Sequence, residues 1–183
     1  MALLILGIVI FMTIHLFSAT PLRASLVGNI GEKPFKGGFA LVSFLGLGLI
    51  IYGYSQADFH ALWAPPAWAR SLLIGLMPIV TILWVVAETP NNIKGKVRHP
   101  MLIGMILWGL GHLTANGDLA STLIFASFAA YSLLNIFMVN ARNTYEAPKP
   151  VSRKWDAGVV VGGLILFLLL YNFHGSFTGM PIR

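Results

Sequence analysis

Long apolar runs separated by short charged segments dominate the chain. Six uncharged runs cover most of it: Met1–Leu22, Gly37–Ala57, Ser71–Ala87, His99–Gly117, Leu119–Ala141 and Ala157–Ile182. Each is close to the ~20 residues with which a helix crosses a hydrocarbon core of ~30 Å. Within the runs the apolar residues are continuous and do not alternate with polar ones, which favours helices over a β-barrel. The pattern predicts an all-α polytopic membrane helix bundle of about six transmembrane helices.

The composition supports a chain that lies almost entirely in lipid. Apolar residues make up 57% and charged residues only 10%, and the mean hydropathy is +0.80, whereas soluble domains carry about 25% charged residues. This excludes a water-soluble enzyme and a disordered chain. We therefore expect residues 1–183 to form a single integral membrane domain. With no cysteine, disulfides, Fe–S clusters, thiolate-ligated haem and a cysteine nucleophile are also excluded.

The basic residues predict how the helices are oriented. Ten of the 12 lie in three alternate loops: Arg23, Lys33 and Lys36, then Lys94, Lys96 and Arg98, then Arg142, Lys149, Arg153 and Lys154. The positive-inside rule places these loops in the cytoplasm and both termini outside. The net charge of +6 is thus a topology signal and not a nucleic-acid footprint. We expect a multi-pass protein of the inner (cytoplasmic) membrane, in contact with membrane lipids.

Two of the histidines lie well inside apolar runs and away from the end of the chain, where an ionisable residue marks a functional site by default. His15 and His112 either hydrogen-bond to neighbouring helices or ligate a metal or haem. Haem suits an apolar slot between helices with one histidine on each side, whereas zinc or di-iron sites usually add cysteine or carboxylate ligands. His15 lies near the cytoplasmic end of its run and His112 near the outer end. By depth alone, His15 with His99 is therefore a rival pair.

Small residues indicate where membrane helices approach closely. The predicted second helix contains Gly46 and Gly48, and the predicted sixth contains Gly158 and Gly162 in small-xxx-small spacing. Close helix packing is the expected role of these glycines.

One stretch of the chain resembles a known family. It consists of Arg98-His99-Pro100-Met101-Leu102-Ile103-Gly104, Leu107-Trp108, Gly111-His112-Leu113 and Ala115-Asn116-Gly117-Asp118-Leu119-Ala120. With Ile14-His15-Leu16, Leu22-Arg23, Gly31-Glu32 and Tyr52-Gly53-Tyr54, it resembles the signature of the NnrU family of bacterial membrane proteins. The resemblance covers most of the chain from Met1 to about Met138.

The resemblance implies a haem protein. The NnrU family is linked to denitrification and nitric oxide metabolism, and it is similar to the zeta-carotene isomerase, a membrane protein with haem b. In that isomerase the iron ligands are a histidine of an early helix, matched here by His15, and one thirteen positions after the Arg-His-Pro histidine, matched by His112. A further histidine of the isomerase falls at Tyr131, which argues against the isomerase reaction itself.

The expected site therefore has haem b iron on His15 and His112. Trp108 and Asn116 flank His112 by one helical turn on either side and, with His99, complete the expected cofactor-binding set. At the cytoplasmic rim, Arg98 begins the fourth predicted helix, and we expect its guanidinium to contact a haem propionate or a lipid phosphate. A lipid-phase substrate, a small gas such as nitric oxide, or electron transfer fits such a site, and the oligomeric state is left open.

Two alternatives belong to other classes. The Arg-His-Pro stretch is also similar to membrane methyltransferases of the isoprenylcysteine type, which use S-adenosylmethionine. Those enzymes need paired acids after the following helix, and Asn140–Glu146 contains a single glutamate. The other alternative is a cofactor-free scaffold that assists assembly of a larger membrane enzyme.

Overall fold

The computed structural model describes residues 1–142, 148–180 and 182. In this part of the chain it contains seven α-helices and one 3₁₀ turn. They are α1 (Ala2–Ser18), α2 (Leu22–Ile30), α3 (Glu32–Ser55), α4 (Ala69–Glu88), η1 (Ile93–Gly95), α5 (Pro100–Ala115), α6 (Leu119–Ala141) and α7 (Arg153–Thr178). The all-α class predicted from the apolar runs is confirmed.

Four of the described helices, α3, α4, α6 and α7, are long and apolar enough to cross a membrane. A fifth span results if α1 and α2 are counted as one bent pair. Helix α5 has 16 residues and rises about 24 Å, less than the hydrocarbon core. The chain is therefore a multi-pass membrane protein with four or five candidate spans. The count of six and the orientation of the termini stay predictions.

The first apolar run is broken near its end. Helix α1 stops at Ser18, and the chain turns by 84° into α2, a segment that the sequence pattern assigned to a loop. Pro21 has no N–H with which to continue the α1 ladder, and the Thr20 hydroxyl donates to the Phe17 carbonyl at 2.7 Å, which closes the last turn. The charged segment after α1 is thus helical.

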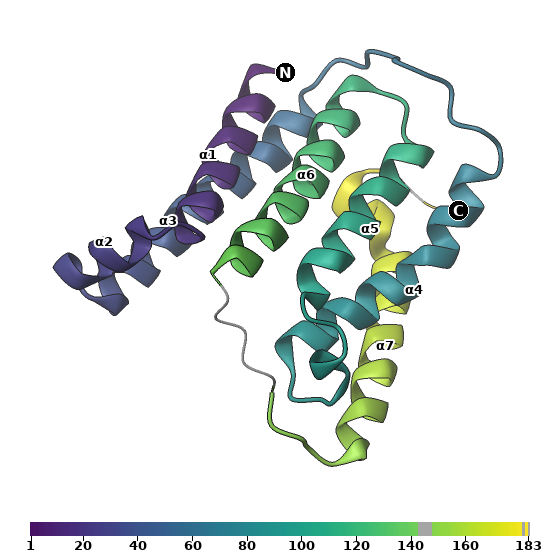
Figure 1. The fold of residues 1–183 in the computed structure, drawn as a ribbon. Coiled ribbons are helices and arrows are strands. Elements are labelled where there is room, and N and C mark those ends of the chain that lie inside the picture. The colour runs from purple at the N-terminus through teal and green to yellow at the C-terminus, as the bar shows by residue number, and fades with distance from the viewer. Residues whose placement is uncertain (143–147, 181, 183) are drawn as a thin grey trace.

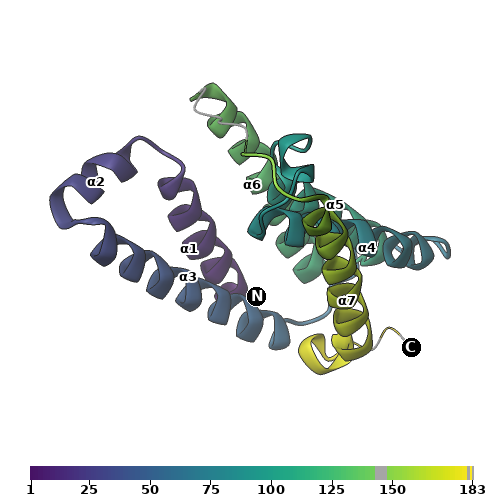
Figure 2. The ribbon, with the colours of Figure 1, turned by 90° about the horizontal axis from the view of Figure 1, so that it is seen from below.

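The helices form two groups joined by α6. Helices α1, α2 and α3 make one leg, and α4, α5 and α7 make the other; Figures 1 and 2 show α6 between them. Helix α6 packs along α5 and also contacts α1 and α3. Both candidate ligand histidines, on α1 and α5, therefore have α6 as a common neighbour.

Glycines set how closely the helices of each leg pack. A β-carbon on Gly7 of α1 would lie 2.6 Å from the Ile50 nitrogen of α3, and one on Gly53 of α3 would collide with the Leu4 backbone. Gly46 meets α1 in the same way, at Phe11, whereas Gly48 faces open space. The expectation of close packing is thus met by one of that pair only.

Close packing of α7 rests on a different glycine from those expected. Gly158 faces open space, and a β-carbon on Gly162 would be in ordinary contact with Val85. It is Gly163 that meets α4, where a β-carbon would lie 2.5 Å from the Ile82 Cα.

The long loop between α3 and α4 closes the end of the molecule that carries the N-terminus. The Gly117 carbonyl accepts from the N–H groups of Leu62 and Trp63 at 2.7 and 3.1 Å, and the Leu119 N–H donates to the His60 carbonyl. Helix α6 then begins at its N-cap Asp118, which accepts from the Ser121 N–H at 2.9 Å. These bonds fix α6, and with it the aromatic side chains that it carries, relative to both legs.

The orientation in the membrane is testable with fusions. The α1–α2 turn, the α4–α5 segment and the start of α7, which carry half of the basic residues, lie at the end opposite to the N-terminus (Figure 1). By the positive-inside rule, alkaline phosphatase fused after Arg183 is expected to be active in whole cells. A fusion at Lys94 is expected to be inactive, and the reverse result would exchange the two faces.

Candidate functional site

Each of the two helix-borne histidines has one ring nitrogen fixed. In His15 the Nδ1–H donates to the Phe11 carbonyl at 2.7 Å, and in His112 it donates to the Trp108 carbonyl at 2.9 Å. Within the described residues, no hydrogen bond reaches Nε2 of either ring. In the neutral imidazole this bond leaves the Nε2 lone pair available to a metal, and it is the kind of backbone bond that orients metal-ligating histidines.

A continuous series of aromatic contacts connects the two histidines. His15 stacks on Phe11 with ring centroids 4.0 Å apart, and Phe11 lies 5.4 Å from Phe128 of α6. Phe128 in turn lies 5.7 Å from Trp108, whose ring is 5.0 Å from that of His112. The space between the two histidines is therefore lined, and in this conformation filled, by aromatic rings.

Helix α6 provides a scale for their depths. His112 stacks on Phe125 at 4.5 Å, Phe128 lies at the middle of the series, and His15 meets Tyr131 edge-on at 5.9 Å. From residue 125 to residue 131 a helix rises about 9 Å. The structure thus brings both histidines onto α6 but leaves them offset along it, which agrees with the depth argument made from the sequence.

The rival ligand His99 lies farther still along the same helix. Its Nε2–H donates to Asn140 Oδ1 at 2.8 Å, and Asn140 follows Tyr131 by nine residues, a rise of about 13.5 Å. His99 is also the N-cap of α5, beside the exposed Arg98. These two residues mark the rim of the bundle, so the structure does not bring His99 to His15.

The two remaining expected site residues, Trp108 and Asn116, make hydrogen bonds with His112 that involve backbone carbonyls. The Asn116 amide donates to the His112 carbonyl at 2.8 Å and so closes the end of α5. Trp108 contributes its carbonyl to the His112 ring and its own ring to edge-on contacts with Phe125 and Phe128. Asn116 therefore fixes the helix end that carries His112, without touching the imidazole.

A polar pair beside His15 was not singled out from the sequence. The Asn135 amide donates to the Tyr131 hydroxyl at 2.9 Å, while the Asn135 Oδ1 is buried without a hydrogen-bond partner among the described residues. Buried amide oxygens are usually paired, so this one is a point at which a donor can bind. The signal available in the sequence was their spacing of four, which places two polar residues on one face of an apolar helix.

The donor set limits the metal chemistry. In the described part of the chain, no three side chains of the histidine, cysteine, aspartate and glutamate types lie close enough to share a metal ion. A structural zinc or di-iron site needs about four such ligands. Haem needs at most two, because the porphyrin supplies the others. The chemistry of the two histidines fits haem, but their rings are offset by about 9 Å along α6.

The comparisons with known proteins agree with this membrane architecture. The family model described as NnrU protein matches residues 3–182, nearly the whole chain. No match was found among curated proteins or among solved structures. Because the family model covers the spans, both legs and all the residues discussed above, the chain belongs to the NnrU family.

Proposed function

We propose that this NnrU protein binds haem b within the membrane, with His112 and His15 as its iron ligands. The observation that carries the proposal is the shared state of the two imidazoles. Each has Nδ1 bonded to the carbonyl one turn earlier, and Nε2 is without a hydrogen bond among the described residues, in aromatic surroundings. Both rings are half-buried in apolar runs, and a histidine with only a structural role in lipid would satisfy both nitrogens, because a polar atom without a hydrogen bond is costly there.

The offset between the histidines determines how they ligate. His112 of α5 and His15 of α1 would hold the group, but their rings differ by about 9 Å along α6 and Phe128 lies between them, so binding by both would require α1 to shift along α6. Haem held by both histidines would supply electron transfer, and haem held by one would supply a site for a small ligand such as nitric oxide or an alkene.

The residues of the chain would contribute orientation and water exclusion. The carbonyls of Phe11 and Trp108 hold the two ring planes, and the Phe125 and Phe128 rings keep water from the apolar slot. At the rim, Arg98 and His99 would offer charge and a hydrogen-bond donor to haem propionates. We place this activity in the inner membrane and link it, through the family, to nitric oxide metabolism or redox-type isomerisation.

The optical spectrum of the detergent-purified protein tests the proposal. The reduced pyridine haemochrome spectrum is expected to show the α and β bands of haem b at a stoichiometry near one per chain. A high-spin spectrum of the untreated protein corresponds to one histidine on the iron, and a low-spin spectrum to two. Protein that stays featureless after expression with added haem precursor and reconstitution with hemin would contradict the proposal.

One contact keeps methyl transfer as a second candidate. The bond between His99 and Asn140 holds the Arg-His-Pro motif beside the segment that follows α6, which is where such methyltransferases complete their cofactor pocket. The rest of the segment, residues 143–147, lies outside the described residues. This candidate predicts saturable S-adenosylmethionine binding that depends on Arg98 and His99. A cofactor-free scaffold instead predicts co-purification with a partner and tolerance of alanine at both His15 and His112.

A further inference from the structure

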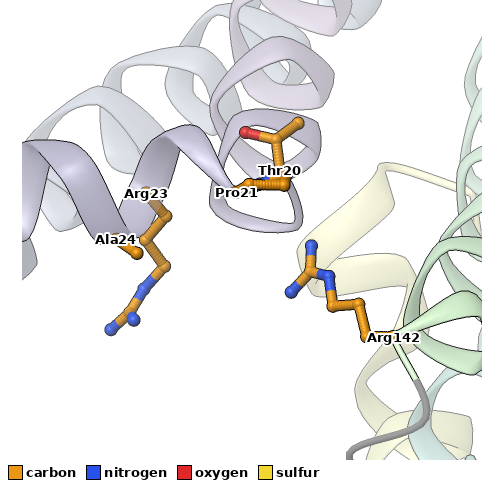
Figure 3. A pocket seen from close by; sticks show the side chains of 5 residues that line it. All are labelled: Thr20, Pro21, Arg23, Ala24 and Arg142. Carbon is orange, nitrogen blue, oxygen red and sulfur yellow. The ribbon is translucent and has the colours of Figure 1, made fainter.

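A pocket opens at the basic end of the molecule, where the two legs separate. It is lined by Thr20, Pro21, Arg23 and Ala24 from the α1–α2 turn and by Arg142 at the end of α6. Figure 3 shows the Arg142 guanidinium pointing from the end of α6 toward Thr20 and Pro21, whereas the Arg23 side chain, which also lines the pocket, points away from α6. Neither arginine belongs to the proposed haem site.

The charges around this pocket favour an anion. Arg23 donates to Glu32 at 2.8 Å and lies over the Phe35 ring, and Lys36 reaches the same carboxylate at 3.3 Å. One carboxylate is thus shared by two cations, while the guanidinium of Arg142 has no hydrogen bond or ion pair within the described part of the chain. The cluster therefore has excess positive charge, and guanidinium groups bind oxyanions with paired N–H donors.

The position of the pocket favours an anion that belongs to a lipid. It lies level with the ends of two apolar helices, α1 at Ser18 and α6 at Ala141, which is where headgroups meet the hydrocarbon core. The helices that end there carry exposed apolar side chains: Leu22 begins α2, and Leu134 and Phe137 lie on the last two to three turns of α6, with 61, 47 and 63% of their surface exposed. A ligand with an anionic head and apolar tails satisfies both features, and a free anion satisfies only the first.

We propose that this pocket binds the phosphate of an anionic phospholipid between Arg142 and Arg23, with the acyl chains along the end of α6. The lipid would connect the end of α6 to the α1–α2 turn, at the end of the molecule where these two segments lie apart (Figure 2). The site is independent of haem, so its failure would leave the proposed function untouched.

Native mass spectrometry of delipidated protein reloaded with phosphatidylglycerol tests this site. Arg142→Gln is expected to weaken retention about tenfold, the effect of losing one charge-assisted hydrogen bond, and Arg142→Lys is expected to restore part of it. Arg153→Gln removes the same charge from the same end, outside the pocket, and is the matched control. Phosphatidylcholine is expected to bind weakly and equally to all variants.

Three outcomes would overturn the proposal. Equal loss of phosphatidylglycerol from Arg142→Gln and Arg153→Gln would show diffuse charge attraction and no site. Displacement of the lipid by millimolar inorganic phosphate would make the ligand a free anion. Normal lipid retention with a lower haem content in Arg142→Gln would assign the pocket to a haem propionate. Arg23→Gln serves as a second variant, with circular dichroism to confirm that α2 stays folded.

Discussion

Protein carrying His112→Ala is expected to purify with its haem b content reduced more than about tenfold, since even partners of a metal ligand are worth 10- to 100-fold in affinity. The imidazole of His112 lies against the rings of Trp108 and Phe125, and neither of these rings could replace its Nε2 as the proposed iron ligand. The pyridine haemochrome assay, normalised to protein, measures the loss. His60→Ala is the matched control, because His60 is exposed in the α3–α4 loop and only its backbone carbonyl has a structural role.

The companion variant His15→Ala separates the two ligation states. If one histidine holds the iron in the conformation described here, His15→Ala keeps the haem and its spin state, and the double variant is apoprotein. If α1 moves so that both ligate, His15→Ala converts a low-spin spectrum into a high-spin one. A His112→Ala protein with unchanged spectrum, together with a His99→Ala protein that has lost its haem, would contradict the ligand assignment.

Gly53→Ala is expected to destabilise the protein by about 1–3 kcal/mol, the usual cost of overpacking a tight interface. The new methyl group would collide with the Leu4 backbone of α1, and backbone atoms cannot turn aside as a flexible side chain can. Helices α1 and α3 would have to separate, and the Leu4–Ile50 cluster between them would lose contacts. Thermal unfolding in detergent, followed by helical circular dichroism, measures the effect.

Gly48→Ala is the control for this packing prediction. It lies on the same helix, it makes the same change, and a β-carbon there meets nothing within 4 Å. Because alanine has the higher helix propensity, Gly48→Ala is expected to be neutral or slightly stabilising. Equal shifts of the unfolding temperature in both variants would show that the α1–α3 approach does not limit stability.

The sequence by itself determined the class of this protein and its main helices. Uncharged runs long enough to cross a membrane form helices, because the backbone N–H and C=O groups of a segment in lipid must be hydrogen-bonded within that segment. The helices therefore follow the runs, as α6 follows Leu119–Ala141. The imidazoles of His15 and His112 stood out for the same reason: a polar ring in an apolar run is costly unless it has a role.

Only the tertiary structure decided where these groups lie relative to one another. Apolar content does not predict the break after Ser18. At the membrane interface the backbone groups of a turn can hydrogen-bond to water or headgroups, so a turn there needs few polar residues and hardly changes the hydropathy of the run. Apolar content also does not distinguish Gly53, which contacts α1 closely, from Gly48, which does not. The difference depends on which face of α3 is turned toward α1. The depths of His15 and His112 are likewise set by how α1 and α5 each dock on α6. Contacts between segments far apart in sequence, such as Phe128 with Phe11 and Trp108, leave no periodic trace in either segment alone.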